Sequence, residues 1–278
     1  MPHSDVRITI LVDNNAAEGL GSEHGFALWI ETAGTRILFD TGKGTVLNSN
    51  AAALGVDLSA TAVAVLSHGH YDHTGGVASV LRAASRAVVC CHRAALRRRY
   101  SVSGGASREI GMPEDAALAI QNLPSERIRW ADLPLRLTHH VGVTDSIPRQ
   151  TPFEDTGGAF FLDPAGTMPD PIEDDIALWI ETGEGIVLCV GCSHSGIINT
   201  LAHVRQITAG RKVRAVIGGM HLLNAGNTRL KQTFSSLRER VPDILVPCHC
   251  TGQKAAVRLK EAFGECVVPG AAGMKFDF

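Results

Sequence analysis

The 278-residue chain lacks the features that would direct it to a membrane, a secretory route or a nucleic acid. No apolar run approaches the roughly 20 residues of a membrane span, and charged residues interrupt residues 1–15 too early for a secretory leader. The formal charge of −2 provides no bulk attraction for nucleic acids or membrane surfaces. We therefore expect a cytoplasmic protein with reduced thiols and with no nucleic-acid or membrane partner.

Motifs of several enzyme classes are also missing or incomplete. The stretch TGKGT (41–45) lacks the lysine placement of a nucleotide-binding loop, and no nucleophile elbow supports a covalent serine mechanism. Cys189 and Cys192 have the spacing of a redox motif, but they lie along a predicted strand and do not open a helix. Cys248 and Cys250 lack the paired C-x-x-C of a structural zinc site. We therefore assign none of these motifs a role of its own.

Histidine, by contrast, is abundant, with 12 histidines against two tyrosines. Three of them occur with an aspartate inside the stretch LSHGHYDHTGG (66–76). The preceding run TAVAVL (61–66) is typical of a strand buried on both faces, and a helix is predicted over 75–84. The cluster therefore occupies a strand-to-helix loop, where the rigid strand end would hold it in place.

The spacing of these four side chains predicts metal binding. Ligands at alternate positions let His68 and His70 point at one ion, while Asp72 and His73 turn toward a second. Two divalent ions roughly 3.5–4 Å apart would share a bridging hydroxide, and they would lower the pKa of the water from which it forms. A mononuclear site and solvated loop histidines are the alternatives.

A repeated hexapeptide suggests how the fold is built. ALWIET occurs at 27–32 and again at 177–182, and each copy precedes a glycine-containing turn and another predicted strand, ILFDTG (37–42) and IVLCVGC (186–192). Six identical residues in matching contexts favour an internal duplication, with coincidence as the alternative. We predict that the two segments are equivalent strand pairs related by an approximate two-fold axis.

The other predicted elements complete two β-rich halves with helices outside. Strands are predicted at 6–12, 26–31, 36–40, 61–66, 213–217 and 243–247, and helices at 75–84, 197–208, 229–240 and 253–263. This pattern predicts an α/β fold with an αββα arrangement, two packed sheets covered by helices. We expect a single domain over 1–278, in which the Gly-, Pro- and acid-rich stretch of about 100–172 is a loop-rich lid over the site.

The motif HGHYDH (68–73) resembles the HxHxDH motif of the metallo-β-lactamase superfamily, and ILFDTG (37–42) resembles the strand-end aspartate motif of that family. The resemblance spans nearly the full chain and implies an αββα metallo-β-lactamase-like sandwich. Five further stretches are similar to one branch, the metal-dependent hydrolases similar to dihydropterin ribofuranosylaminobenzene-phosphate synthases: LVDNN (11–15), IPRQTPFE (147–154), GCSHSG (191–196), GGMHL (218–222) and PCHCTG (247–252). That branch implies a small, anionic substrate of the phosphoester, ester or pterin type.

The resemblance also implies ligands from the second half of the chain. His249, at the end of the predicted strand DILVP, matches the last metal histidine of the superfamily, and His194 follows the predicted strand IVLCV. Where the superfamily has a bridging aspartate this chain has Cys192, and a thiolate there would favour zinc or iron over magnesium. We predict that Cys192 lies near the ions and that His194 is the stronger ligand, with a bridging thiolate as the alternative. His140 is a candidate for the intermediate histidine of the family.

The predicted ligand sets are therefore His68, His70 and His194 at one ion, and Asp72, His73 and His249 at the other. Three more residues receive roles around them. His221 follows another predicted strand and could ligate, move protons or hold an oxyanion, with a structural histidine as the alternative. Asp40 is expected to orient a ligand imidazole. Arg149 is expected to clamp a phosphate or carboxylate of the substrate, with a surface salt bridge as the alternative.

Together these residues predict a dinuclear metal-dependent hydrolase. Its two divalent ions are expected to be Zn²⁺, with Mn²⁺ or Fe²⁺ as alternatives, and a metal-bound hydroxide would attack a small-molecule substrate. Asp72 and His221 are the expected catalytic residues, Asp72 by steering a proton. A non-haem iron oxidoreductase on the same fold and a metal-retaining binding module are the alternatives. The sequence does not determine the oligomeric state.

Overall fold

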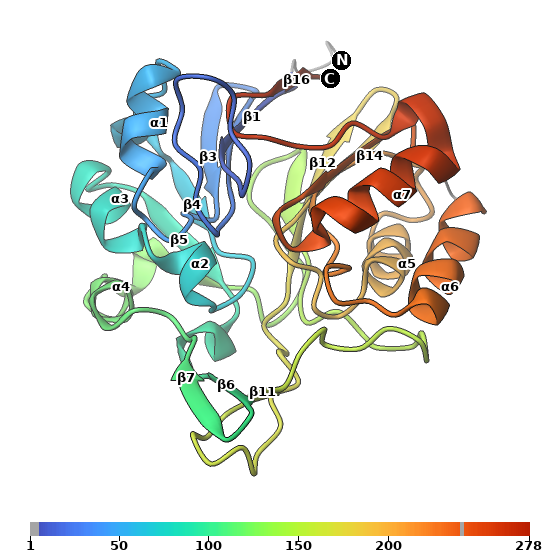
Figure 1. Ribbon diagram of the computed structural model, residues 1–278. Coiled ribbons are helices and arrows are strands. Elements are labelled where there is room, and N and C mark those ends of the chain that lie inside the picture. Colours follow the sequence, from blue (N-terminus) through green and yellow to red (C-terminus); the bar gives the residue numbers. More distant parts are fainter. Residues whose placement is uncertain (1–5, 240–241) are drawn as a thin grey trace.

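Two large mixed sheets packed face to face form the centre of the computed structural model, which describes residues 6–239 and 242–278 (Figure 1). The first sheet has the spatial order β16 (Lys275–Asp277), β1 (Val6–Val12), β2 (Ala27–Thr32), β3 (Thr35–Phe39), β4 (Val63–Val65), β5 (Val88–Cys91) and β8 (Ile128–Trp130). The second has the order β15 (Ile244–Cys248), β14 (Val213–Gly219), β13 (Gly185–Val190), β12 (Ala177–Thr182), β10 (Val141–Val143) and β9 (Leu135–Arg136).

Helices cover the outer face of each sheet. On the first sheet they are α1 (Leu47–Ala53), α3 (Val77–Ala83) and α4 (Glu114–Gln121), while the short α2 (Tyr71–Thr74) lies beyond the end of β4. On the second they are α5 (Ile197–Ile207), α6 (Asn227–Arg238) and α7 (Gln253–Phe263) (Figure 1). This is the α/β fold predicted from the sequence, an αββα sandwich. Within the described ranges, no helix has the length and apolarity needed to cross a membrane.

Apolar side chains from both sheets meet between them. Phe26, Leu28 and Ile30 of the first half and Leu178 and Ile180 of the second belong to one fully buried cluster. Because side chains alternate between the two faces of a strand, Trp29 and Trp179 lie on the outer face of their sheets, where they pack under the helices. Each copy of the hexapeptide therefore contributes to two cores, which explains why its first four positions are all apolar.

The two copies of ALWIET occupy equivalent strands. β2 and β3 pair antiparallel with Leu28 opposite Phe39, and β12 and β13 pair antiparallel with Leu178 opposite Cys189, so both partners are offset by 150 positions. In each half the second strand of the pair is followed by two parallel neighbours, β4 and β5 or β14 and β15. The predicted equivalence of the strand pairs is confirmed in pairing and register. The two-fold axis that relates them stays a prediction.

The stretch 100–172 is more ordered than the sequence suggested. It contains α4, β8, β9 and β10, and its β6 (Tyr100–Ser103), β7 (Ala106–Glu109) and β11 (Phe160–Phe161) form a separate three-stranded sheet. Figure 1 shows this small sheet extending below the two large ones. The sequence predicted a loop-rich stretch and did not reveal this small sheet, because its strands pair between segments more than 50 residues apart. The single-domain boundary and the lid function stay predictions.

Candidate metal centre

The histidine loop begins where the buried strand β4 ends and leads into the short helix α2. Gly69 is packed so closely against the backbone that a Cβ there would lie 2.1 Å from the carbonyl oxygen of Ala95. Its N–H donates a 2.7 Å hydrogen bond to Asp174, which is fully buried. The loop is therefore tied down between its two histidines, and the side chains on either side of Gly69 are directed into the molecule.

The first predicted ion site has its donors close together. His68 Nε2 and His70 Nδ1 are 3.0 Å apart, near the roughly 3.4 Å expected for two nitrogen ligands of one tetrahedral zinc ion. The ring of His194 lies 4.8 Å from that of His68 and 4.9 Å from that of His70, measured between centroids. Donor atoms of His68, His194 and Cys192 all lie within 4.8 Å of one another.

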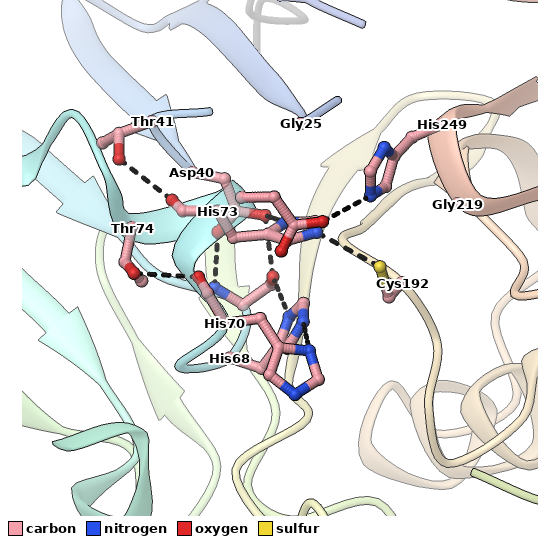
Figure 2. A network of polar contacts seen from close by, with 12 residues as sticks. Gly25, Asp40, Thr41, His68, His70, His73, Thr74, Cys192, Gly219 and His249 are labelled. Carbon is pink, nitrogen blue, oxygen red and sulfur yellow. Dashed lines mark hydrogen bonds and ion pairs between the residues drawn. The ribbon is translucent and has the colours of Figure 1, made fainter. Parts of the chain in front are cut away.

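The second predicted site also contains Cys192. Its sulfur is 3.1 Å from His73 Nε2, and His73, Cys192 and His249 form a second group of donor atoms within 4.8 Å (Figure 2). Asp72 Oδ2 lies 3.3 Å from His249 Nε2. The cysteine is thus the residue common to both groups, at the position where the resemblance implied a bridging aspartate. This geometry favours the thiolate-bridge alternative more strongly than the sequence did.

Buried polar groups behind the ligands orient their rings. Asp40 accepts from Ser67 and lies 2.7 Å from His73 Nδ1, which leaves His73 Nε2 to face the centre (Figure 2). His249 Nδ1 is 2.8 Å from Asn14 Oδ1, and His194 Nδ1 is 2.8 Å from the carbonyl oxygen of Thr156. The expected orienting role of Asp40 is therefore present.

Burial keeps several of these imidazoles neutral, as metal ligation requires. It lowers the pKa of His70 to about 3 and holds the pKa values of His68 and His194 well below their usual range, with neighbouring histidines adding to the effect. Burial opposes ionisation of Asp72, but the imidazoles of His24 and His249 outweigh it and lower its pKa well below the usual value. At His73 burial also favours the neutral ring, but the charge and hydrogen bond of Asp40 outweigh it and raise the pKa to about 9. The site thus combines neutral nitrogen donors at His68, His70 and His194 with an ionised carboxylate, and His73 would release a proton on binding a metal.

The donor set fits a pair of divalent ions. Among the described residues, His194 Nε2 is buried and makes no hydrogen bond, and the buried His249 Nε2 has Asp72 Oδ2, another predicted ligand, 3.3 Å away. A buried nitrogen without a partner is costly, and a bound ion would satisfy His194 while being held by His249 and Asp72. Imidazole, thiolate and carboxylate together suit Zn²⁺ or Fe²⁺ better than Mg²⁺.

A cavity of about 350 Å³ opens onto these ligands and contains residues that the sequence reading missed. His24 lies in it 3.0 Å from Asp72, and Cys250 lies beside His221 and Cys192. His24 belongs to no sequence motif, so nothing in the sequence indicated a role for it. Cys250 follows the predicted ligand His249 directly, and that position was the one signal that it lies near the site. Phe160, Ser101 and Arg108 reach the cavity from the small sheet.

Of the residues predicted outside the ligand sets, His221 lies in the cavity, whereas Arg149 and His140 are outside its described lining. His221 lines the cavity, with its ring 4.3 Å from that of His194, so it is near the reacting groups. Arg149 donates to the carbonyl oxygens of His194 and Pro171, and it is absent from the described lining of the cavity. Those carbonyls take two of the five N–H donors of the guanidinium, and the substrate clamp at Arg149 stays a prediction. His140 lies next to β10, also outside the described cavity lining, and is not a ligand candidate.

Comparison with known proteins agrees with this geometry. A family model described as the metallo-β-lactamase superfamily matches residues 20–249. An uncharacterized protein of Methanocaldococcus jannaschii is 30% identical over 91% of this chain and 94% of its own length. A 7,8-dihydropterin-6-methyl-4-(beta-D-ribofuranosyl)-aminobenzene-5'-phosphate synthase of the same organism is 29% identical over 88% and 86%. A crystal structure described as a metal-dependent hydrolase of the β-lactamase superfamily is 30% identical, with a TM-score of 0.83 over 98% and 99% of the two chains.

Proposed function

This chain belongs to the metallo-β-lactamase superfamily, and on that premise we propose that it is a hydrolase that uses two divalent metal ions on a small, anionic substrate. The observation that carries the proposal is the convergence of two histidine groups on Cys192, with a buried, unpartnered Nε2 on His194 among the described residues. Zinc is the proposed metal because imidazole and thiolate donors suit it.

The ligands would divide between the ions as their spacing suggests. His68, His70 and His194 would hold one ion, Asp72, His73 and His249 the other, and Cys192 would lie between them. Such a pair of ions supplies Lewis acidity and makes water a nucleophile at neutral pH. Asp40 keeps the ring of His73 aimed at the centre, and Asn14 does the same for His249.

The other polar residues of the cavity serve the substrate. His221 lies close enough to the ligand histidines to hold or transfer a proton at the substrate's leaving group. His24, 3.0 Å from Asp72, directs that carboxylate by hydrogen bonding. Phe160 covers the ligand side of the cavity and excludes water from the rings of His70 and His194.

Elemental analysis of the protein after zinc loading tests the metal proposal. We expect two equivalents of zinc in the wild type, and about one in His194→Ala and in His249→Ala. His139→Ala removes an exposed histidine outside the described cavity lining and should keep two, which makes it the matched control. A single equivalent in the wild type would contradict the dinuclear proposal.

A substrate panel tests the reaction. Phosphodiesters, phosphomonoesters and thioesters are offered to the zinc-loaded and iron-loaded proteins, and we expect hydrolysis of at least one class that chelation abolishes. A synthase is the second candidate because a relative is named as one. It would be favoured if no ester were cleaved in water while a phosphate- or pterin-bearing substrate was consumed only when a second reactant was present.

A further inference from the structure

The three-stranded sheet presents one row of side chains to the metal cavity. Phe160 on β11 pairs with Ser101 on β6, and Ser101 pairs with Arg108 on β7. Cross-strand partners project from the same face of a sheet. All three line the cavity that contains the metal ligands, so this face is directed at the site. The next row, from Phe161 through Tyr100 to Glu109, projects from the opposite face.

The inner end of the row is aromatic and lies against the ligands. The ring of Phe160 has its centroid 5.3 Å from that of His70 and 5.5 Å from that of His194. It also lies 6.2 Å from the ring of His221. A flat, apolar group of a substrate that reacts at the metal centre would therefore pack against Phe160.

The outer end of the row is cationic. The guanidinium carbon of Arg108 lies 5.6 Å from the ring centroid of Tyr71, which immediately follows the ligand His70. This cation–π contact and a side-chain hydrogen bond with Tyr71 hold the guanidinium in the cavity lining, and the rest of its five N–H donors remain for a ligand. Among the described residues that line the cavity, Arg108 is the only lysine or arginine. Recognition of an oxyanion away from the metal ligands therefore depends on this side chain.

We propose that the row Phe160–Ser101–Arg108 binds an elongated substrate whose apolar or aromatic part packs on Phe160 and whose far carboxylate or phosphate pairs with Arg108. Two strand spacings separate Phe160 from Arg108, so the oxyanion lies roughly 10 Å farther along the cavity than the reacting end. Ser101, between them, offers a hydroxyl to a polar atom in the middle of the substrate. The inference rests on the proposed function in taking the metal centre as the reacting end.

Two probes that differ only at the far end test this arrangement. One is a biphenyl monocarboxylate and the other a biphenyl dicarboxylate with its second acid at the opposite end of the molecule. Their dissociation constants for the zinc-loaded protein are measured by calorimetry. We expect the dicarboxylate to bind about tenfold more tightly, because its second acid gains a charge-assisted hydrogen bond.

Three variants locate that preference. Arg108→Gln should abolish it, while Phe160→Ala should weaken both probes equally and leave their ratio unchanged. Arg98→Gln is the matched control. Arg98 is an exposed arginine whose Nε lies 3.8 Å from Oε1 of Glu109, the residue after Arg108, and it is outside the described cavity lining. It should keep the preference. Circular dichroism checks that each variant is folded.

The outcomes separate this proposal from the proposed function. Equal affinities in the wild type, failure of both probes to bind, or an undiminished preference in Arg108→Gln would each overturn the binding row. A preference that is lost in Arg108→Gln while no ester is cleaved would support the row and contradict the hydrolase. Ester cleavage by a protein that binds the two probes equally would support the hydrolase and contradict the binding row.

Discussion

Replacing Arg99 by methionine should destabilise the protein and disturb the histidine loop at the same time. Arg99 and Asp174 are both completely buried, and they are joined by two hydrogen bonds, of 2.8 and 2.5 Å. Arg99 also forms an ion pair with a second aspartate, with its Nε 2.8 Å from Asp170 Oδ2. The carboxylate of Asp174 also accepts from Gly69, between the candidate ligands His68 and His70, so the cluster connects the core to the candidate metal centre.

The expected size of the effect follows from burial. Removing one partner of a buried ion pair leaves an uncompensated charge and costs about 3–5 kcal/mol. For a chain of this length that corresponds to a fall in Tm of about 10 °C. Arg97→Met is the matched control, because Arg97 forms its ion pair with Glu173 at the surface, where both side chains are at least 40% exposed. Such a pair contributes about 0–1 kcal/mol.

Urea denaturation and zinc content together check this prediction. Arg99→Met should lower the midpoint of unfolding far more than Arg97→Met, and it should also weaken zinc binding, because Asp174 no longer holds Gly69 in place. If the two variants unfolded at the same urea concentration, the buried cluster would not stabilise the fold. Normal zinc affinity in a destabilised Arg99→Met would show that the loop is held by other contacts.

Three further predictions concern the centre and its surroundings. Asn14→Ala should weaken binding of one zinc ion about 10- to 100-fold in a chelator competition, because His249 loses its orienting partner, while the other ion keeps its affinity. Cys192→Ala should remove more zinc than His194→Ala if the thiolate bridges both ions, and the reverse ranking in elemental analysis would restore the histidine as the stronger ligand. Burial raises the pKa of Asp175 to about 6, from 3.8, so the folded metal-free protein carries an unfavourable carboxylate above pH 6 that becomes neutral as the pH falls. Asp175→Asn should therefore increase the free energy of unfolding by about 3 kcal/mol at pH 8, above both pKa values, and by only about 0.5 kcal/mol at pH 4, where the folded carboxyl is neutral; equal effects at both values would contradict this reasoning.

Local patterns in the chain were enough to predict the layers and to bring four candidate ligands together. The histidine cluster was recognisable because His68 closely follows the buried strand β4 and α2 contains Asp72 and His73, so sequence neighbours are also neighbours in space. The two ALWIET copies determined their own pairing, since a register shift by one residue would turn Leu28 or Leu178 out of the core. In both cases the decisive contacts involve residues within about fifteen positions of each other.

Only the tertiary structure decided which distant side chains share the cavity. His24, Phe160 and Arg108 approach it from three separate segments, and none of them belongs to a motif. Folding also placed the guanidinium of Arg149 against the carbonyls of His194 and Pro171, contacts that its sequence neighbours do not indicate. The physical reason is that such positions are set by non-local strand pairing and backbone hydrogen bonds, which the residue's own sequence neighbourhood does not encode.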